Sequence, residues 1–340
     1  MTDKTALSSS PLVTVVIPAF NAESFIGEAI ASIQCQTLDD WQLIVVDDGS
    51  ADQTTPAARA AAGDDNRIRL IRFDRNQGIS AASNAGFDAA RGEFIARLDA
   101  DDRSLPERLA TQVAAFRACD QLSAAGTHVR IIGGGDRDGQ YAFCTLGDAD
   151  LKARLVEGFN TISGGTLMVR RSFVRQHQIR FDEGIGSAED LDYLISVMAA
   201  GGQIGNVDEV LTEHRDHDNN FTKTRLDLAR PGLFNMRRRV VALWYPGLET
   251  HEVDLIAGLW YGIDFGRFDN LLNAVRAVDR LVVTSAQDYG QNTSIVHDIV
   301  LNCLAAVVAG HRDRLDASHI EAMRFFVSSA VSDMLGRLEQ

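Results

Sequence analysis

The chain has 340 residues, 45% hydrophobic and 24% charged, which is typical of a globular protein with one large domain and an addition. Its 47 acidic residues exceed its 33 basic ones, and the formal net charge of −14 argues against a general nucleic-acid binder. A nucleotide ligand is not excluded, because a divalent cation can screen a diphosphate from neighbouring carboxylates.

The cysteines and the N-terminus indicate the compartment. No two cysteines are spaced as in a CxxC motif, and no disulfide pattern is present. We therefore expect reduced thiols in a cytoplasmic protein. The first ten residues are polar, without the apolar segment of a signal peptide, and no run of 18 or more apolar residues predicts a membrane span.

Apolar, β-rich runs alternate with helical patterns over residues 12–109. The runs cover residues 12–18, 41–47, 67–73 and 93–98. Between the first two, one helical face is predicted from Phe25, Ile26, Ala29, Ile30 and Ile33. Two capping boxes, Ser50 with Gln53 and Ser104 with Glu107, predict helix starts. The alternation predicts parallel strands with right-handed crossovers in a three-layer α/β domain.

The pattern changes along the rest of the chain. Strands are predicted near residues 128–132 and 166–170, and a helix over 191–199, whereas residues beyond about 225 are mostly helical in pattern. We expect a polar tail over residues 1–11, an α/β domain over 12–225 and a helical region over 226–340. Pro231-Gly232 is predicted to break the regular structure near that boundary.

Acidic residues follow the predicted strands at the edge where open α/β sheets bind ligands. Asp99 and Asp101 lie two apart, so an extended segment directs both carboxylates to one side. Such a pair suits Mg²⁺ or Mn²⁺, although a solvated turn before a helix would have the same composition. Asp47 and Asp48 end another strand, and an inward carboxylate there could accept hydrogen bonds from a base or a ribose.

Several motifs, in their order, resemble the N-terminal domain of the family 2 glycosyltransferases, which have the GT-A fold. The resemblance covers residues 12–220. The matching stretches are VTVVIPAFNAE (13–23), IVVDDGSADQT (44–54), NQGISAASNAG (76–86), GEFIARLDADDRSLPERL (92–109), GGTLMVRRSFV (164–174), SAEDLDYLISV (187–197) and EHRDHDNN (213–220). The resemblance makes 12–225 a catalytic GT-A domain, Rossmann-like and three-layered, that binds a nucleotide sugar.

The resemblance also implies roles for individual residues. Asp48 would read the base, usually uracil. The remaining residues of the nucleotide-sugar site would be Pro18, Ala19, Asn21, Asn76, Asp99 and Ala100. Asp99 and Asp101 would form the metal-binding DxD motif for Mn²⁺ or Mg²⁺, with Asp101 as the direct ligand and His217 near the metal or diphosphate.

The resemblance also implies that Asp190 is the general base of the reaction and that Glu189, beside it, binds or orients the acceptor. Local sequence alone offers a structural alternative, because Ser187 could cap a helix whose first turn favours acidic residues. The chain also departs from many relatives at Ser83-Asn84, where they have Arg-Asn. Arg75 and Arg97 are the two candidates to replace that basic contact.

The sequence thus predicts an inverting, metal-dependent glycosyltransferase. It would move a sugar from a nucleotide donor, a UDP-sugar by resemblance, to a saccharide or lipid-linked saccharide in bacterial exopolysaccharide or surface-polysaccharide assembly, without nucleic acid. The alternatives are a catalytically silent carbohydrate-binding scaffold and a sugar nucleotidyltransferase. A local basic excess suggests peripheral contact with the inner face of the membrane, or else a packed helix: Arg225, Arg230, Arg237, Arg238 and Arg239.

Overall fold

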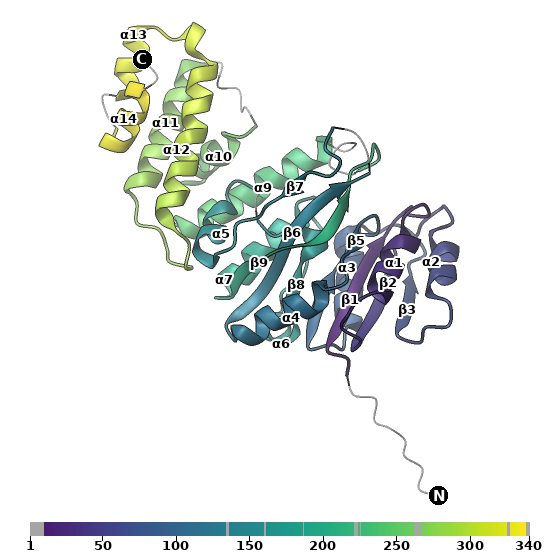
Figure 1. The fold of residues 1–340 in the computed structure, drawn as a ribbon. Coiled ribbons are helices and arrows are strands. Elements are labelled where there is room, and N and C mark those ends of the chain that lie inside the picture. The colour runs from purple at the N-terminus through teal and green to yellow at the C-terminus, as the bar shows by residue number, and fades with distance from the viewer. Residues whose placement is uncertain are drawn as a thin grey trace, which may run out of the picture. The chain divides into compact units, whose positions relative to one another are not determined.

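The computed structural model describes residues 10–133, 136–159, 161–185, 187–220, 224, 226–261, 265, 267–324 and 327–337. It divides into two compact units, coloured along the chain in Figure 1. The first contains Met1–Leu146, Ile162–Gly184 and Asp192–Thr224, and the second contains Gly147–Thr161, Ile185–Leu191 and Arg225–Gln340. Most of the expected polar tail lies outside the described residues, and the domain boundary at 225/226 stays a prediction.

The first unit is built on one mixed sheet. Its elements are β1 (Val13–Ala19), α1 (Ile26–Gln34), β2 (Trp41–Asp47), α2 (Thr54–Ala62), β3 (Ile68–Arg72), α3 (Ile79–Ala89), β4 (Phe94–Arg97), β5 (Arg103–Ser104), α4 (Arg108–Ala118), β6 (Leu122–Ile132), β7 (Tyr141–Ala142), the 3₁₀ turn η1 (Gly164–Thr166), β8 (Met168–Arg170), α6 (Arg171–Gln176), α7 (Glu189–Ala199) and β9 (Gln203–Arg215). Helix α7 starts in the short segment 185–191, which groups with the second unit.

The strands lie in the order β3-β2-β1-β4-β8-β6-β9-β5, with β7 paired to β6. The pairs β1/β2, β1/β4 and β2/β3 are parallel, as the strand–helix alternation predicts. Strand β8 is antiparallel to both β4 and β6, so the sheet becomes mixed beyond the first four strands. The expected α/β architecture is confirmed.

Helices cover both faces of the parallel part (Figure 1). One face packs against α1 and α4, where the apolar stripe Ile26, Ala29, Ile30 and Ile33 is buried as predicted. The other face packs against α3, where Ala82 contacts the side of the sheet that carries Ile44 and Val46. Burial on both faces explains why β1 and β2 are mostly apolar and are buried along their whole length.

Neither predicted capping box opens a helix. Helix α2 starts at Thr54, whose backbone N–H donates to Asp52, while Ser50 accepts from the N–H of Asn21. Helix α4 starts at Arg108, and the N–H of Leu109 in its first turn donates to the side chain of Gln36. Asp52, inside the first motif, and Gln36, from another segment, thus replace the acceptors that the two motifs predict. Ser104 instead forms strand β5.

The second unit is helical in the part of the chain that the structure describes. Its elements are α5 (Asp148–Arg154), α9 (Leu226–Trp244), α10 (Thr250–Gly258), α11 (Phe268–Val283), α12 (Thr293–Gly310), the 3₁₀ turn η2 (Arg312–Arg314), α13 (Ala317–Arg324) and α14 (Ser329–Arg337). Pro231 lies inside α9 instead of marking a boundary. Gly232 packs so closely on Ser187 that an added Cβ would lie 2.1 Å from its Oγ.

Two features of this unit bear on membrane contact. Helix α12 is long and apolar enough to cross a bilayer by length and composition, with a mean hydropathy of 1.6 and 22% of the window buried. This differs from the sequence expectation because a window average tolerates interspersed polar residues such as Asp298 and Asn302. Of the basic excess, Arg237 is buried and Arg238 pairs with Asp254, and Arg225 lies outside the described residues. Arg237 therefore packs in the unit's interior, whereas Arg238 forms an ion pair at its surface.

Two helical glycines test the packing of the first unit. A Cβ at Gly86 would lie 2.2 Å from Cγ1 of Val16, a buried residue of β1, whereas a Cβ at Gly27 would meet nothing within 4 Å. We expect Gly86→Ala to lower the unfolding free energy by about 1–3 kcal/mol through overpacking. Gly27→Ala is the matched control and should be neutral or stabilising by up to about 1 kcal/mol. Urea denaturation measures both, and equal effects would contradict this packing.

Candidate active site

The parallel register brings three loops to one edge of the sheet. Ala19 at the end of β1 pairs with Asp47 at the end of β2, and Val16 pairs with Arg97 at the end of β4. Residues 18–21, 47–50 and 98–102 therefore follow neighbouring strands at their carboxyl ends, where α/β sheets bind ligands. Pro18, Ala19 and Ala100 are buried at this edge of the sheet.

Hydrogen bonds hold the first two loops together. Asn21 has a left-handed backbone, with φ of 49°, and its side chain accepts the N–H of Ala51 at 3.1 Å. Its own N–H donates to Ser50 at 2.9 Å, and Ala22 N donates to Thr54 Oγ1 at 2.7 Å. Asn21 therefore shapes the loop, and its predicted contact with a nucleotide stays a prediction.

Asp48 is buried and its carboxylate anchors the loop before α3. Its oxygens accept the backbone N–H of Gln77 at 2.7 Å, the N–H of Gly78 at 2.9 Å and the side-chain amide of Asn76 at 2.9 Å. Burial raises the pKa of Asp48 and the charge of Asp47 adds to the rise, although the two backbone N–H groups oppose it. Two predicted nucleotide-site residues, Asp48 and Asn76, are thus brought together directly.

The first aspartate of the DxD motif faces an arginine and a glycine. Arg97 is buried and donates to Asp99 Oδ1 at 2.9 Å. A Cβ at Gly165 would lie 2.9 Å from Asp99 Oδ2 and 2.9 Å from Asp102 Oδ2, so a larger residue would fill the space into which both carboxylates point. Sequence reasoning did not single out Gly165, because only its position opposite these carboxylates gives it a role.

The second aspartate contacts the predicted histidine. His217 Nε2 lies 3.0 Å from Asp101 Oδ2, although the residues are 116 positions apart. The N–H of Asn219 donates to His217 Nδ1 at 3.2 Å, so Nε2 carries the proton that Asp101 accepts. The ring stacks on Phe25 with a centroid distance of 4.8 Å, which gives Phe25 a role at the site instead of in the α1 stripe.

A third aspartate joins the loop to strand β9. Asp102 is buried and accepts the N–H of Arg215 at 2.9 Å and a hydrogen bond from His214 at 3.2 Å. Burial raises the pKa of Asp102, while the hydrogen bond and charge of Asp102 raise the pKa of His214 to about 9. Sequence analysis predicted no role for Asp102.

The donor set was tested for its fit to a divalent cation. Asp99 and Asp101 supply hard carboxylate oxygens, and Gly165 leaves the space before Asp99 open. His217 adds an imidazole donor in the tautomer that frees the Nε2 lone pair from the hydrogen bond to Asp101. Oxygen donors with one imidazole suit Mn²⁺ or Mg²⁺. Among the described residues no three such side chains are already clustered as a metal site. The residues fit a cation that also draws ligands from a diphosphate, and their role as ligands stays a prediction.

The predicted catalytic pair, Glu189 and Asp190, forms the first turn of α7. Both side chains are half-buried, and Asp190 Oδ1 accepts the N–H of Leu191 at 2.8 Å. The preceding residue, Ala188, has a left-handed backbone with φ of 59°, so the chain turns sharply into the helix. Ser187, the alternative cap, donates to the carbonyl of Ala229. Catalysis by this pair stays a prediction.

The departure at Ser83-Asn84 has a structural counterpart. Both residues are buried in α3, and Asn84 holds the backbone of Phe181 through both its amide nitrogen and oxygen. Of the two arginines considered as substitutes, Arg97 lies beside Asp99 and 5.8 Å from the Phe181 ring, whereas Arg75 is exposed. Arg97 therefore places a buried positive charge beside the DxD motif.

An α/β sheet with acidic residues at its carboxyl edge is compatible with a GT-A glycosyltransferase, and comparisons with known proteins identify that class. The family model "Glycosyl transferase family 2" matches residues 14–177. An uncharacterized glycosyltransferase of Haemophilus influenzae is 30% identical over 221 residues, covering 63% of this chain and 68% of that protein. The chain belongs to glycosyltransferase family 2, and the resemblance seen in its motifs is confirmed.

Other relatives extend the comparison. The succinoglycan biosynthesis protein ExoO of Rhizobium meliloti is 34% identical over 209 residues, 58% of this chain and 59% of that protein. The structure of Staphylococcus aureus TarS 1-349 in complex with UDP-GlcNAc has a TM-score of 0.60 at 17% identity, covering 96% of this chain and 90% of that one. Mannosyltransferase PcManGT of Pyrobaculum calidifontis, in complex with GDP-Man and Mn²⁺, has a TM-score of 0.56 at 17% identity, covering 98% and 87%. These likenesses confirm the GT-A fold.

The contact between His214 and Asp102 predicts a pH dependence of stability. Because the folded-state pKa of His214 is raised from 6.5 to about 9, its stabilising proton is fully bound below pH 6.5 and is lost as the pH rises through 9. We expect the unfolding free energy of the metal-free protein to fall over this range, and His214→Gln to flatten the fall. Urea denaturation in chelator-containing buffers from pH 6 to 10 measures this. Parallel curves for the two proteins would contradict the assignment.

Proposed function

We propose that this glycosyltransferase moves a sugar from a UDP-sugar to a hydroxyl of a saccharide or lipid-linked saccharide, with inversion at the anomeric carbon. The observation that carries the proposal is the contact between Asp101 and His217 beside Asp99, at the edge of the sheet where the nucleotide of an α/β protein binds. The UDP-GlcNAc complex of TarS and the GDP-Man and Mn²⁺ complex of PcManGT support a nucleotide-sugar donor.

In this proposal Asp99, Asp101 and His217 hold Mn²⁺ or Mg²⁺. The cation would supply charge neutralisation for the departing nucleoside diphosphate. Arg97 adds a fixed positive charge beside Asp99 and keeps that carboxylate oriented. Asp48 fixes the loop 76–78, and with it the wall of the nucleotide site.

Asp190 acts as the general base on the acceptor. Its carboxylate takes the hydroxyl proton as the acceptor oxygen bonds to the anomeric carbon and the bond to the diphosphate oxygen breaks. A single displacement needs one base, and the diphosphate leaves without a strong general acid. Glu189, the preceding residue in α7, orients the acceptor.

The product belongs to polysaccharide assembly, which the name of ExoO as a succinoglycan biosynthesis protein supports. We place the reaction at the cytoplasmic face of a bacterial membrane, where a lipid-linked acceptor is within reach. Peripheral contact through the apolar helix α12 is compatible with this placement.

Calorimetric titration of UDP tests the donor site. With Mn²⁺ present we expect UDP to bind at least about tenfold more tightly than without it, because a cation held by Asp99 and Asp101 would offset the repulsion between their carboxylates and the diphosphate. Asp101→Ala should abolish this Mn²⁺ dependence, whereas Asp120→Ala, which removes an exposed carboxylate of the same unit, should keep it. If UDP does not bind, GDP and dTDP are the next donors to test, and failure of all three would favour a silent scaffold.

Asp190→Asn tests the base. The substitution keeps the shape of the side chain and removes its basicity, so we expect kcat to fall about 10²- to 10⁴-fold while UDP binding is unchanged. Glu209→Gln, at an exposed carboxylate, is the control. Transfer is measured with a UDP-sugar and a saccharide acceptor, and NMR of the product reports the anomeric configuration. A retained configuration would exclude the single displacement.

A further inference from the structure

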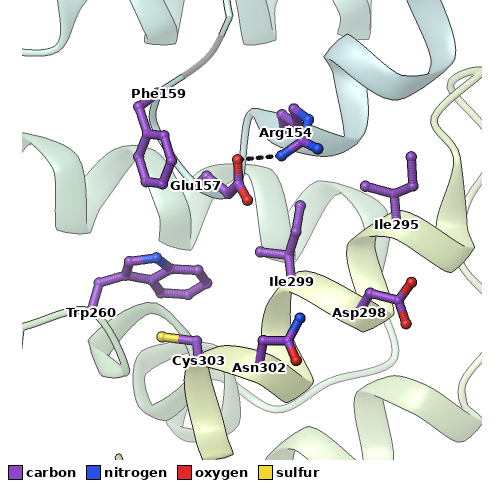
Figure 2. A pocket seen from close by; sticks show the side chains of 9 residues that line it. All are labelled: Arg154, Glu157, Phe159, Trp260, Ile295, Asp298, Ile299, Asn302 and Cys303. Atoms are coloured by element: carbon purple, nitrogen blue, oxygen red, sulfur yellow. Dashed lines mark hydrogen bonds and ion pairs between the residues drawn. The ribbon is translucent and has the colours of Figure 1, made fainter. Parts of the chain in front are cut away.

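The second unit contains a cavity of about 400 Å³ that the transfer reaction does not use. Its lining residues all belong to this unit and come from three segments (Figure 2). The end of α5 contributes Arg154, the stretch after it contributes Glu157 and Phe159, and Trp260 follows α10. Helix α12 contributes one face, with Asp298 and Asn302 one helical turn apart. A volume of this size holds one or two sugar rings.

Two aromatic rings form one side of the cavity. Phe159 is 55% exposed, and Trp260 is half-buried. The guanidinium of Arg237 lies 4.7 Å from the Trp260 ring centroid and donates to the backbone carbonyls of Val156 and Glu157, which fixes the ring relative to the segment after α5. Figure 2 shows both rings on one side and the polar groups of α12 across from them. The cavity thus offers flat apolar surfaces that are held in place.

The polar groups of the cavity are planar. Arg154 and Glu157 bond to each other at 2.9 Å, so their charges cancel. Asp298 and Asn302 are exposed, and among the described residues neither has a hydrogen-bond or ion-pair partner. A carboxylate accepts and an amide both donates and accepts, which is the combination that hydroxyl groups of a ligand satisfy.

The charge and the mixed lining select the ligand class. Asp298 places a negative charge at the cavity and the buried guanidinium of Arg237, against Trp260, a positive one, so no net positive charge is present to favour a phosphate, a nucleotide or an anionic lipid headgroup. Four polar side chains in the lining disfavour a purely apolar chain, because each would lose its water without a partner. A neutral saccharide has apolar ring faces and peripheral hydroxyls, and so matches aromatic rings on one side and planar polar groups on the other.

We propose that this cavity binds a neutral saccharide, as a second holding site for the acceptor chain. The inference rests on the proposed function, because the acceptor of that reaction is itself a saccharide. A second site of attachment raises the effective concentration of a long acceptor at the enzyme without adding a contact to the reacting sugar. Short acceptors gain nothing from it.

The full-length protein is applied to an array of bacterial surface oligosaccharides, and each structure that binds is then titrated in solution. Trp41 and Trp244 are buried, so Trp260 is the tryptophan that acrylamide quenches most readily, and a bound saccharide should protect it. We expect Asn302→Ala and Trp260→Ala each to weaken binding at least about tenfold, the loss of one good hydrogen bond or one stacked ring. Trp260→Phe keeps a ring and should restore part of the affinity.

Ser294→Ala, at an exposed position of α12 outside the cavity lining, is the matched control and should bind as the unchanged protein does. Thermal denaturation verifies that each variant is folded. If Trp260→Ala does not fold, the test rests on Asn302→Ala, which replaces an exposed side chain. Binding that persists at the unchanged affinity in Asn302→Ala would overturn the proposal, as would an array on which no structure binds.

UDP titration of the same variants separates this site from the transfer site. If the cavity acts as proposed, Asn302→Ala binds UDP normally and has an unchanged kcat, but a raised KM for long acceptors alone. Failure of the unchanged protein to bind UDP, GDP and dTDP would remove the proposed function, while array binding that depends on Asn302 would still support the cavity as a saccharide site.

Discussion

Asp102 lies in the turn after β4, and its buried carboxylate accepts the N–H of Arg215 at the end of β9. His214 bonds to the same carboxylate, and the Arg215 side chain returns to the carbonyl of Asp101 at 2.9 Å. These bonds continue the antiparallel pairing of β5 with β9, in which Arg103 lies opposite Glu213, and so hold the turn after β4 on β9, although β8 and β6 separate those two strands in the sheet. The contact between Asp101 and His217 depends on this junction, because both residues are neighbours of the residues that it fixes.

A buried carboxylate is costly unless it has partners, and every acid of this edge has them. Asp48 uses backbone N–H groups, Asp99 uses Arg97, and Asp102 uses a backbone N–H and an imidazole. Arg108, buried beneath them, donates to the carbonyl of Arg97, and burial lowers its pKa to about 10. The acidic edge is therefore stabilised by short-range pairing, in a chain whose overall charge of −14 does not compensate it.

The sequence predicted the parts of the fold that depend on local pattern. β2 begins and ends at the predicted residues, and the apolar stripe of α1 is buried, because period and β-propensity are properties of a short window. The capping boxes failed because Asp52, within the first motif, and Gln36, from outside the second, accept the N–H groups at the helix starts. Gly165, Asp102 and the place of Phe25 against His217 were missed because they arise from segments more than 60 residues apart. The association of His217 with Asp101 was predicted only through the family resemblance.

The hydrogen bonds between Asp102 and the end of β9 also determine the order in which this part of the site can form during synthesis. A ribosome adds Asp102 to the chain 113 residues before Arg215. At 5–20 residues per second that interval is on the order of 6–23 s, during which the first four strands can already pair while the acidic turn lacks its partners. In the nascent protein Asp48 and Asp99 can already pair with the loop 76–78 and with Arg97, while Asp102 still lacks its partners. Only the arrival of β9 supplies them, so the last strand of the first unit fixes the turn that carries the DxD motif.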